Sequence, residues 1–303
     1  MNDRTRSRET NKLWYHVGAV ITMIAWGVSF VSTKVLLDCG LQPTEVYVYR
    51  TLLAYIILLL IHHNRFFSNS LRDELLFAVC GLCAGSLYYI AENTALEYTL
   101  VSNVSLIVTT APLLTTLLVG AIYKNERPGR NVLIGSLIAF VGVGFVIFNS
   151  SFELNVKPLG DLLALGAALS WAVYSLVLRK LSALYGVMFI TRKTFFYGML
   201  TAIPFLLGQP YHSPLSVFLQ TDVILNLLFL GIFCSMLAFL IWAWVNKGLG
   251  AVKSSNYLYF QPVVTLIASA LLLGETVSIV GYTGCALILI GVWFSDRYGK
   301  KYR

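Results

Sequence analysis

Charged side chains are rare inside the long apolar stretches of this sequence, so the few that occur there are the first candidates for chemistry. Glu92 and Arg50 each lie within such a stretch. A charge near the centre of a bilayer costs about 2.5–3.5 kcal/mol even on the lenient insertion scale. Two interpretations of Glu92 are open: it binds a cationic group or a proton, or it forms a structural ion pair with Arg50 or Lys34.

Two tryptophans, Trp26 and Trp171, lie close to the centres of two apolar stretches. Membrane tryptophans usually gather at the lipid–water interfaces, where the indole N–H stays hydrated. A central pair therefore indicates a polar cavity or a buried partner, and we favour cavity lining over packing. Ser29 and Tyr174 each follow a tryptophan by three residues and are expected on the same helix face.

Two prolines, Pro112 and Pro262, lie near the centres of two further stretches. A proline inside a helix frees a carbonyl and bends the helix, so each is predicted to be a hinge or a static kink. Polar residues accompany them, but amides in a membrane also bond between helices without any ligand. The complete set of candidate substrate-binding residues is Trp26, Ser29, Arg50, Tyr88, Tyr89, Glu92, Thr109, Trp171, Tyr174, Trp242, Asn256, Tyr259 and Gln261.

Other charged residues have simpler interpretations. Glu126 and Glu275 occupy loops and are predicted to anchor the start of the next helix by accepting backbone N–H groups. Arg192 and Lys193, at the end of a stretch, are expected to snorkel into water. The histidines and carboxylates have no spacing typical of a metal site, and no catalytic residues or cofactors are predicted.

The elements that position these residues follow from composition. The 303 residues are 57% hydrophobic and 12% charged, and apolar stretches long enough to cross a bilayer recur along the chain. This pattern predicts an all-α membrane protein with ten transmembrane helices. They are expected near residues 13–37, 45–62, 75–97, 101–123, 129–148, 158–181, 187–208, 223–247, 251–273 and 277–296.

The net charge of +8 does not indicate nucleic-acid binding, because the basic residues lie in short gaps between apolar stretches. Most of the 22 basic residues fall in gaps on one side of the predicted membrane, whereas Lys157 alone lies on the other. The positive-inside rule then predicts cytoplasmic termini for a multi-pass protein of the bacterial inner (plasma) membrane.

An internal repeat of about 150 residues joins the two halves of the chain. Trp26 matches Trp171, and Pro112 matches Pro262. We expect a basic tail at 1–12, a five-helix repeat at 13–148, a connecting loop at 149–157, a second repeat at 158–296 and a basic tail at 297–303. Five spans are an odd number, so the repeats have inverted topology, an architecture suited to alternating access.

The motifs resemble those of the EamA branch of the drug/metabolite transporter superfamily over nearly the whole chain. They are Ala25 to Phe30 with its echo Ser170 to Tyr174, Pro112 with Asn125 to Arg127, and Pro262 with Leu273 to Glu275. The resemblance implies a central cavity lined by spans 1, 3, 4, 6, 8 and 9. It also implies transport of amino acids, related metabolites or toxic analogues.

The leading prediction is therefore a secondary active or facilitative transporter, not an enzyme, that exports a small amphipathic metabolite such as an amino acid. A carrier of nucleotide sugars or other phosphorylated metabolites is the alternative, but only Lys34 and Arg50 are candidate cavity cations. An intramembrane enzyme or sensor acting on lipid is a third hypothesis. The expected partners are a small molecule and the lipid bilayer, with the chain as a monomer or homodimer.

Overall fold

A computed structural model describes residues 3–63, 65–122, 129–147, 158–209, 212–274 and 278–298, and every regular element among them is a helix. Short π-helical and 3₁₀ segments continue several of the α-helices. The elements are α1 (Asp3–Asp38), α2 (Pro43–Ile61), α3 (Leu71–Gly81), η1 (Leu82–Ser86), α4 (Leu87–Tyr98), α5 (Val101–Val108), α6 (Ala111–Ile122), α7 (Arg130–Ile147), α8 (Pro158–Ser182), α9 (Val187–Leu207), α10 (Leu215–Phe218), α11 (Thr221–Leu228), η3 (Phe229–Leu237), α12 (Ala238–Leu249), α13 (Ala251–Ser255), η4 (Asn256–Phe260), α14 (Gln261–Leu273) and α15 (Ile279–Tyr298).

The helices have the length and composition of membrane spans. Six helical segments of the described chain are long and apolar enough to cross a bilayer, and α6, α7 and α15 are shorter apolar helices. Their outward residues are apolar as well: Leu60, Leu200 and Leu271 are all more than 45% exposed. The predicted all-α membrane class is confirmed, while the count of ten spans stays a prediction.

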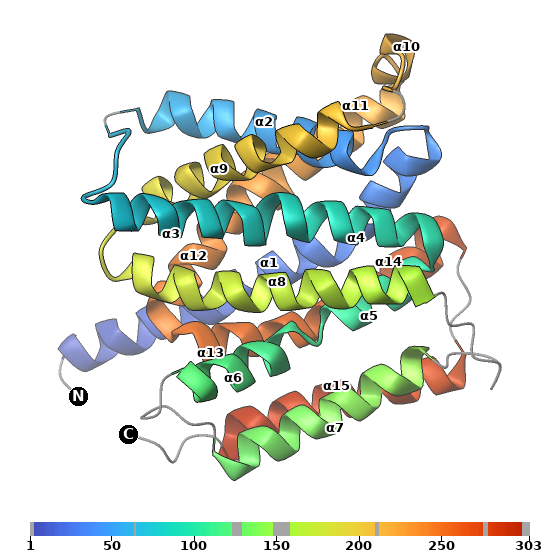
Figure 1. Cartoon of the computed structure of the whole chain (residues 1–303). Coiled ribbons are helices and arrows are strands. Elements are labelled where there is room, and N and C mark those ends of the chain that lie inside the picture. Colours follow the sequence, from blue (N-terminus) through green and yellow to red (C-terminus); the bar gives the residue numbers. More distant parts are fainter. Residues whose placement is uncertain are drawn as a thin grey trace.

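The long helices run roughly along one common direction and form a single bundle (Figure 1). The described start of α1 and the described end of α15 lie at the same end of this bundle (Figure 1). Helices from distant parts of the sequence pack together, with α4 against α8 and α12 against α1. The core between them is therefore built from both halves of the chain.

Several helices are interrupted at their centres. The π-helical segments η1 and η3 divide α3 from α4 and α11 from α12. Thr109 and Thr110 separate α5 from α6, and Pro112 is the second residue of α6. In the same way, η4 precedes α14, and Pro262 is the second residue of α14. Proline is tolerated in the first turn of a helix because its missing N–H would be unpaired there. Both prolines thus begin a new helix after an irregular turn.

Glycines hold α7 and α15 in close contact. A Cβ atom built on Gly135 would lie 2.5 Å from the carbonyl oxygen of Gly291, and one on Gly142 would lie 2.6 Å from that of Gly284. Only glycine allows two helix backbones to approach so closely. These glycine contacts are made within one subunit.

This contact predicts that Gly135→Ala lowers the stability of the purified protein. The new methyl group would press on the Gly291 carbonyl and force the helices apart, at a cost of about 1–3 kcal/mol. Gly166→Ala in α8 is the matched control, since nothing lies within 4 Å of its Cβ position. Thermal unfolding in detergent measures both; equal melting temperatures for the two variants would contradict the tight contact.

Candidate functional site

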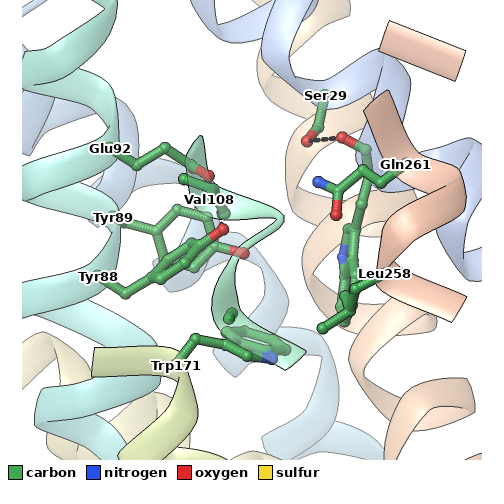
Figure 2. A pocket seen from close by; sticks show the side chains of 10 residues that line it. Ser29, Tyr88, Tyr89, Glu92, Val108, Trp171, Leu258 and Gln261 are labelled. Carbon is green, nitrogen blue, oxygen red and sulfur yellow. Dashed lines mark hydrogen bonds between the residues drawn. The ribbon is translucent and has the colours of Figure 1, made fainter. Parts of the chain in front are cut away.

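A narrow cavity lies near the centre of the bundle, among α1, α4, α8 and the junction of η4 with α14 (Figure 2). Its empty space, including the part that opens outward, is about 380 Å³. The lining consists of four aromatic side chains, three aliphatic ones, one carboxylate, one amide and one aliphatic hydroxyl. The lining residues are Trp26, Ser29, Tyr88, Tyr89, Glu92, Val108, Ala111, Trp171, Leu258 and Gln261.

Glu92 provides the negative charge of this cavity. Its side chain is 6% exposed, and its carboxylate accepts a hydrogen bond of 2.6 Å from the hydroxyl of Tyr88, one turn earlier on α4. In Figure 2 the Glu92 carboxylate and the Tyr88 and Tyr89 hydroxyls point toward the same central space. Among the described residues no basic group forms a direct ion pair with this carboxylate.

In the described chain Glu92 forms no direct ion pair with Arg50 or Lys34, although Arg50 is close enough to act on the Glu92 carboxylate electrostatically. Lys34 pairs with Asp38 at 2.9 Å, one turn along α1. Arg50 is 1% exposed, donates from Nε to the Ser235 hydroxyl at 2.9 Å and stacks 4.6 Å from the centre of the Tyr89 ring. Arg50 therefore lies behind the cavity wall, not in the wall.

The two tryptophans of the repeat meet at the cavity. The ring centres of Trp26 and Trp171 are 5.3 Å apart and the rings are almost perpendicular, at 85°. Edge-to-face packing of this kind is favourable because the positive ring edge meets the negative ring face. The Trp26 N–H donates to the carbonyl of Cys234 at 2.9 Å, whereas the Trp171 N–H has no partner within the described chain.

Gln261 and Ser29 occupy the wall opposite Glu92 (Figure 2). The Ser29 hydroxyl donates to the Trp26 carbonyl of its own helix at 2.8 Å. No described residue forms a hydrogen bond with the side-chain amide of Gln261, which is 5% exposed and lines the cavity. The cavity thus has a carboxylate on one wall and a free amide on the other.

Seven of the predicted binding residues line this cavity, and the others lie elsewhere. Tyr174 and Trp242 support the wall from behind, each with its ring against Trp171. Thr109 donates to the Ser105 carbonyl of its own helix, and Asn256 is half-buried outside the lining. Tyr259, in η4, lines a separate small pocket with residues of α7 and of the start of α6.

Arg50, noted above, completes the set of predicted residues outside the cavity. The loop anchors Glu126 and Glu275 lie outside the described residues. Sequence reasoning missed Val108, Ala111 and Leu258, because it searched for polar groups and these are apolar. Their position beside the two helix interruptions is the feature that could have indicated them.

In the part of the chain that the structure describes, no group of three His, Cys, Asp or Glu side chains gathers at a potential metal site.

A multi-pass helical bundle with a polar cavity at its centre is the architecture of a membrane transporter. Comparison with known families agrees, because the profile of the EamA-like transporter family matches residues 13–148 and 158–295. The chain belongs to this family. The predicted family is thereby confirmed.

Individual relatives cover almost the whole chain. An uncharacterized transporter of Archaeoglobus fulgidus is 26% identical over 284 residues, spanning 92% of this chain and 96% of its own. A protein of Salmonella typhimurium, named a probable amino-acid metabolite efflux pump, is 25% identical over 286 residues, spanning 91% and 93%. A protein known from a crystal structure shares the fold, with a TM-score of 0.70, 17% identity and coverage of 96% and 98%. The names of these relatives confirm the predicted class, a transporter and not an enzyme.

Proposed function

We propose that this transporter carries a small amphipathic metabolite with a cationic amino group, such as an amino acid, and exports it by alternating access. One observation carries the proposal: the Glu92 carboxylate lies in a buried cavity lined by aromatic rings and forms no direct ion pair among the described residues. A buried charge without a counter-charge is costly, so a substrate ammonium or a proton would stabilise it. The name of the Salmonella relative supports the same class of substrate.

The cavity walls suit both ends of such a molecule. An ammonium group beside Glu92 would lie near the rings of Tyr88 and Tyr89, and aromatic rings attract cations through the ring quadrupole. The free amide of Gln261 on the opposite wall would donate to a carboxylate. Transport would then be driven by a gradient, with a proton and the substrate amine as competing occupants of Glu92.

Hydrogen bonds between the two halves support the inverted repeat. Trp26 of α1 donates to a carbonyl in η3, and Ser170 of α8 donates to the Cys83 carbonyl in η1 at 2.7 Å. A π-helical turn frees backbone carbonyls for such partners. Each half thus bonds to the irregular segment of the other, as expected if α1 to α7 and α8 to α15 form ten spans related by a two-fold axis in the membrane plane.

The same axis accounts for the glycine contacts. Gly135 and Gly284 are repeat mates, as are Gly142 and Gly291, and Gly135 meets Gly291 while Gly142 meets Gly284. In a two-fold contact residue i meets residue j of the other unit and j meets i, which is this pattern. The two units could then exchange roles between the inward-open and outward-open states.

Topology is a separate prediction, based on the basic residues at one end of the bundle. We expect both termini in the cytoplasm of a bacterial inner membrane. Single cysteines at Ser68 and Ser216, in a background without the five native cysteines, should react with an impermeant maleimide from opposite sides of the membrane. The Ser68 position should be cytoplasmic; labelling of both positions from outside intact cells would contradict the topology.

The alternative carriers and enzymes have less support. A nucleotide sugar needs several cations around its phosphates, but the cavity lining includes no Lys or Arg and carries the Glu92 carboxylate. A lipid-modifying enzyme needs a convergent acid, base or nucleophile, and the cavity offers one carboxylate bonded to a tyrosine hydroxyl.

Transport by purified protein in lipid vesicles tests the proposal. We expect uptake of at least one labelled amino acid above empty vesicles, and competition by other amines of similar size. The N-acetyl derivative of the transported amino acid, which lacks the positive charge, should compete at least about tenfold less well. Equal competition by the N-acetyl compound, or preferential uptake of a nucleotide sugar, would contradict the substrate class.

A further inference from the structure

A second pocket lies at the end of the bundle where α2 ends and α9 begins, in a different place from the central cavity. Its empty space is about 510 Å³. Arg192 and Lys193 of α9 line it together with aromatic side chains from α2, α9 and the segment 65–70. These two basic residues were expected to snorkel into water, but they are 2% and 6% exposed, so that prediction is wrong.

The two basic residues differ in how their charges are balanced. The Lys193 ammonium lies 2.6 Å from the Glu74 carboxylate and donates to the Phe66 carbonyl at 3.1 Å. Arg192 donates to the backbone carbonyl of His62, and its other terminal nitrogen has no partner. No carboxylate among the described residues pairs with Arg192. The pocket therefore has one buried positive charge that lacks an anion, a costly arrangement unless something neutralises it.

The surroundings of Arg192 indicate where the missing anion comes from. Phe66, Phe67 and Phe196 at the rim are 54%, 80% and 41% exposed. Apolar side chains such as Leu60 and Leu200 continue the same outward faces of α2 and α9 and are 73% and 49% exposed. A surface of this kind faces lipid, and tyrosines such as Tyr55 and Tyr197 of this pocket are typical of the region where lipid tails meet headgroups.

The depth of Arg192 fits the same region. It is the sixth residue of α9, about 8 Å along the axis from the start of that helix at 1.5 Å per residue. Figure 1 shows the start of α9 at the same end of the bundle as the connection between α2 and α3. Arg192 thus lies close to one membrane surface and not at the midplane.

We propose that this pocket binds the phosphate group of an anionic phospholipid from the adjacent leaflet. One terminal nitrogen of Arg192 donates to the His62 carbonyl, and the other is a buried donor that no protein group uses, so it can form a charge-assisted hydrogen bond with a phosphate oxygen. The acyl chains would lie on the exposed rings of Phe66, Phe67 and Phe196. Basic pockets between membrane helices bind lipid headgroups by this combination of charge and apolar contact.

The test compares lipids with the purified full-length protein in a mild detergent. Phosphatidylglycerol should raise the melting temperature by several degrees more than the same amount of zwitterionic phosphatidylcholine. Inorganic phosphate at an equal concentration should have no comparable effect, because it lacks the acyl chains. Arg192→Gln should lose most of the difference between the two lipids, whereas Arg72→Gln, at an exposed position in the first turn of α3, should keep it.

A second measurement keeps the proposal testable if Arg192→Gln does not fold. Native mass spectrometry of the unmodified protein in an equal mixture of the two lipids should retain phosphatidylglycerol at least threefold more often, and Arg192→Lys should retain it too. Equal retention of the two lipids, or the same lipid response in Arg192→Gln as in the unmodified protein, would overturn the proposal. A full stabilisation by inorganic phosphate alone would replace the lipid with a free anion.

Discussion

Replacement of Glu92 by glutamine should reduce transport at least about tenfold while the protein still folds. Glutamine keeps the shape of the side chain and can still accept the hydrogen bond of the Tyr88 hydroxyl, but it has no charge to bind an ammonium group. Loss of one partner of a buried charge pair typically costs about 2–5 kcal/mol of binding, which corresponds to more than a tenfold effect. Initial uptake rates in lipid vesicles measure the loss.

Two controls separate binding from stability. Glu97→Gln makes the same chemical change on α4, but Glu97 is exposed, so transport should be nearly unchanged. Glu92→Gln combined with Arg50→Gln should not recover transport, because no ion pair joins Glu92 to Arg50. Normal transport by Glu92→Gln, or recovery in the double variant, would show that Glu92 has a structural role only.

The tryptophan pair gives the second large expected effect, and the two residues should respond differently. The Trp26 N–H donates to Cys234, so Trp26→Phe leaves a buried carbonyl unpaired and should lower stability by about 1–3 kcal/mol. The Trp171 N–H has no partner in the described chain, so Trp171→Phe should leave stability nearly unchanged. It should weaken transport severalfold, because phenylalanine offers less ring surface and no donor to the cavity.

Alanine at either position should cost more, about 3–5 kcal/mol of stability, because removal of an indole leaves a void beside Trp242 and Phe239. Thermal unfolding measures the stability changes, and vesicle uptake measures transport. If Trp171→Phe transports normally and Trp26→Phe melts at the same temperature as the unmodified protein, the pair is packing material without the assigned contacts.

Much of the fold could be predicted from the sequence because a bilayer demands long apolar helices. Every predicted span falls on one or more described helices. The central cavity was predictable in part for the same reason: Trp26, Trp171 and Glu92 are conspicuous because lipid excludes polar groups from that depth. Selecting the polar side chains within the predicted spans was enough to identify seven residues that line one cavity.

What could not be predicted depends on the rotation of helices and on their irregular turns. Arg50 and Glu92 lie at similar depths, but the Tyr89 ring stacks on Arg50 and a serine takes its Nε donor. The π-helical turns that supply carbonyls to Trp26 and Ser170 have no sequence motif that distinguishes them from a regular helix. Burial of Arg192 depends on how the connection after α2 folds over it, which helix periodicity does not describe.

Substrate binding to the central cavity is tested most directly by intrinsic fluorescence. Trp14, Trp244 and Trp293 are exposed and can be replaced by phenylalanine, leaving the cluster of Trp26, Trp171 and Trp242 as the source of the emission. We predict that the transported amino acid changes this emission saturably and that half of the change is reached at a substrate concentration near the KM for transport. Glu92→Gln should abolish the change. Saturable transport with no change in the emission, or an unaltered response in Glu92→Gln, would contradict binding in this cavity.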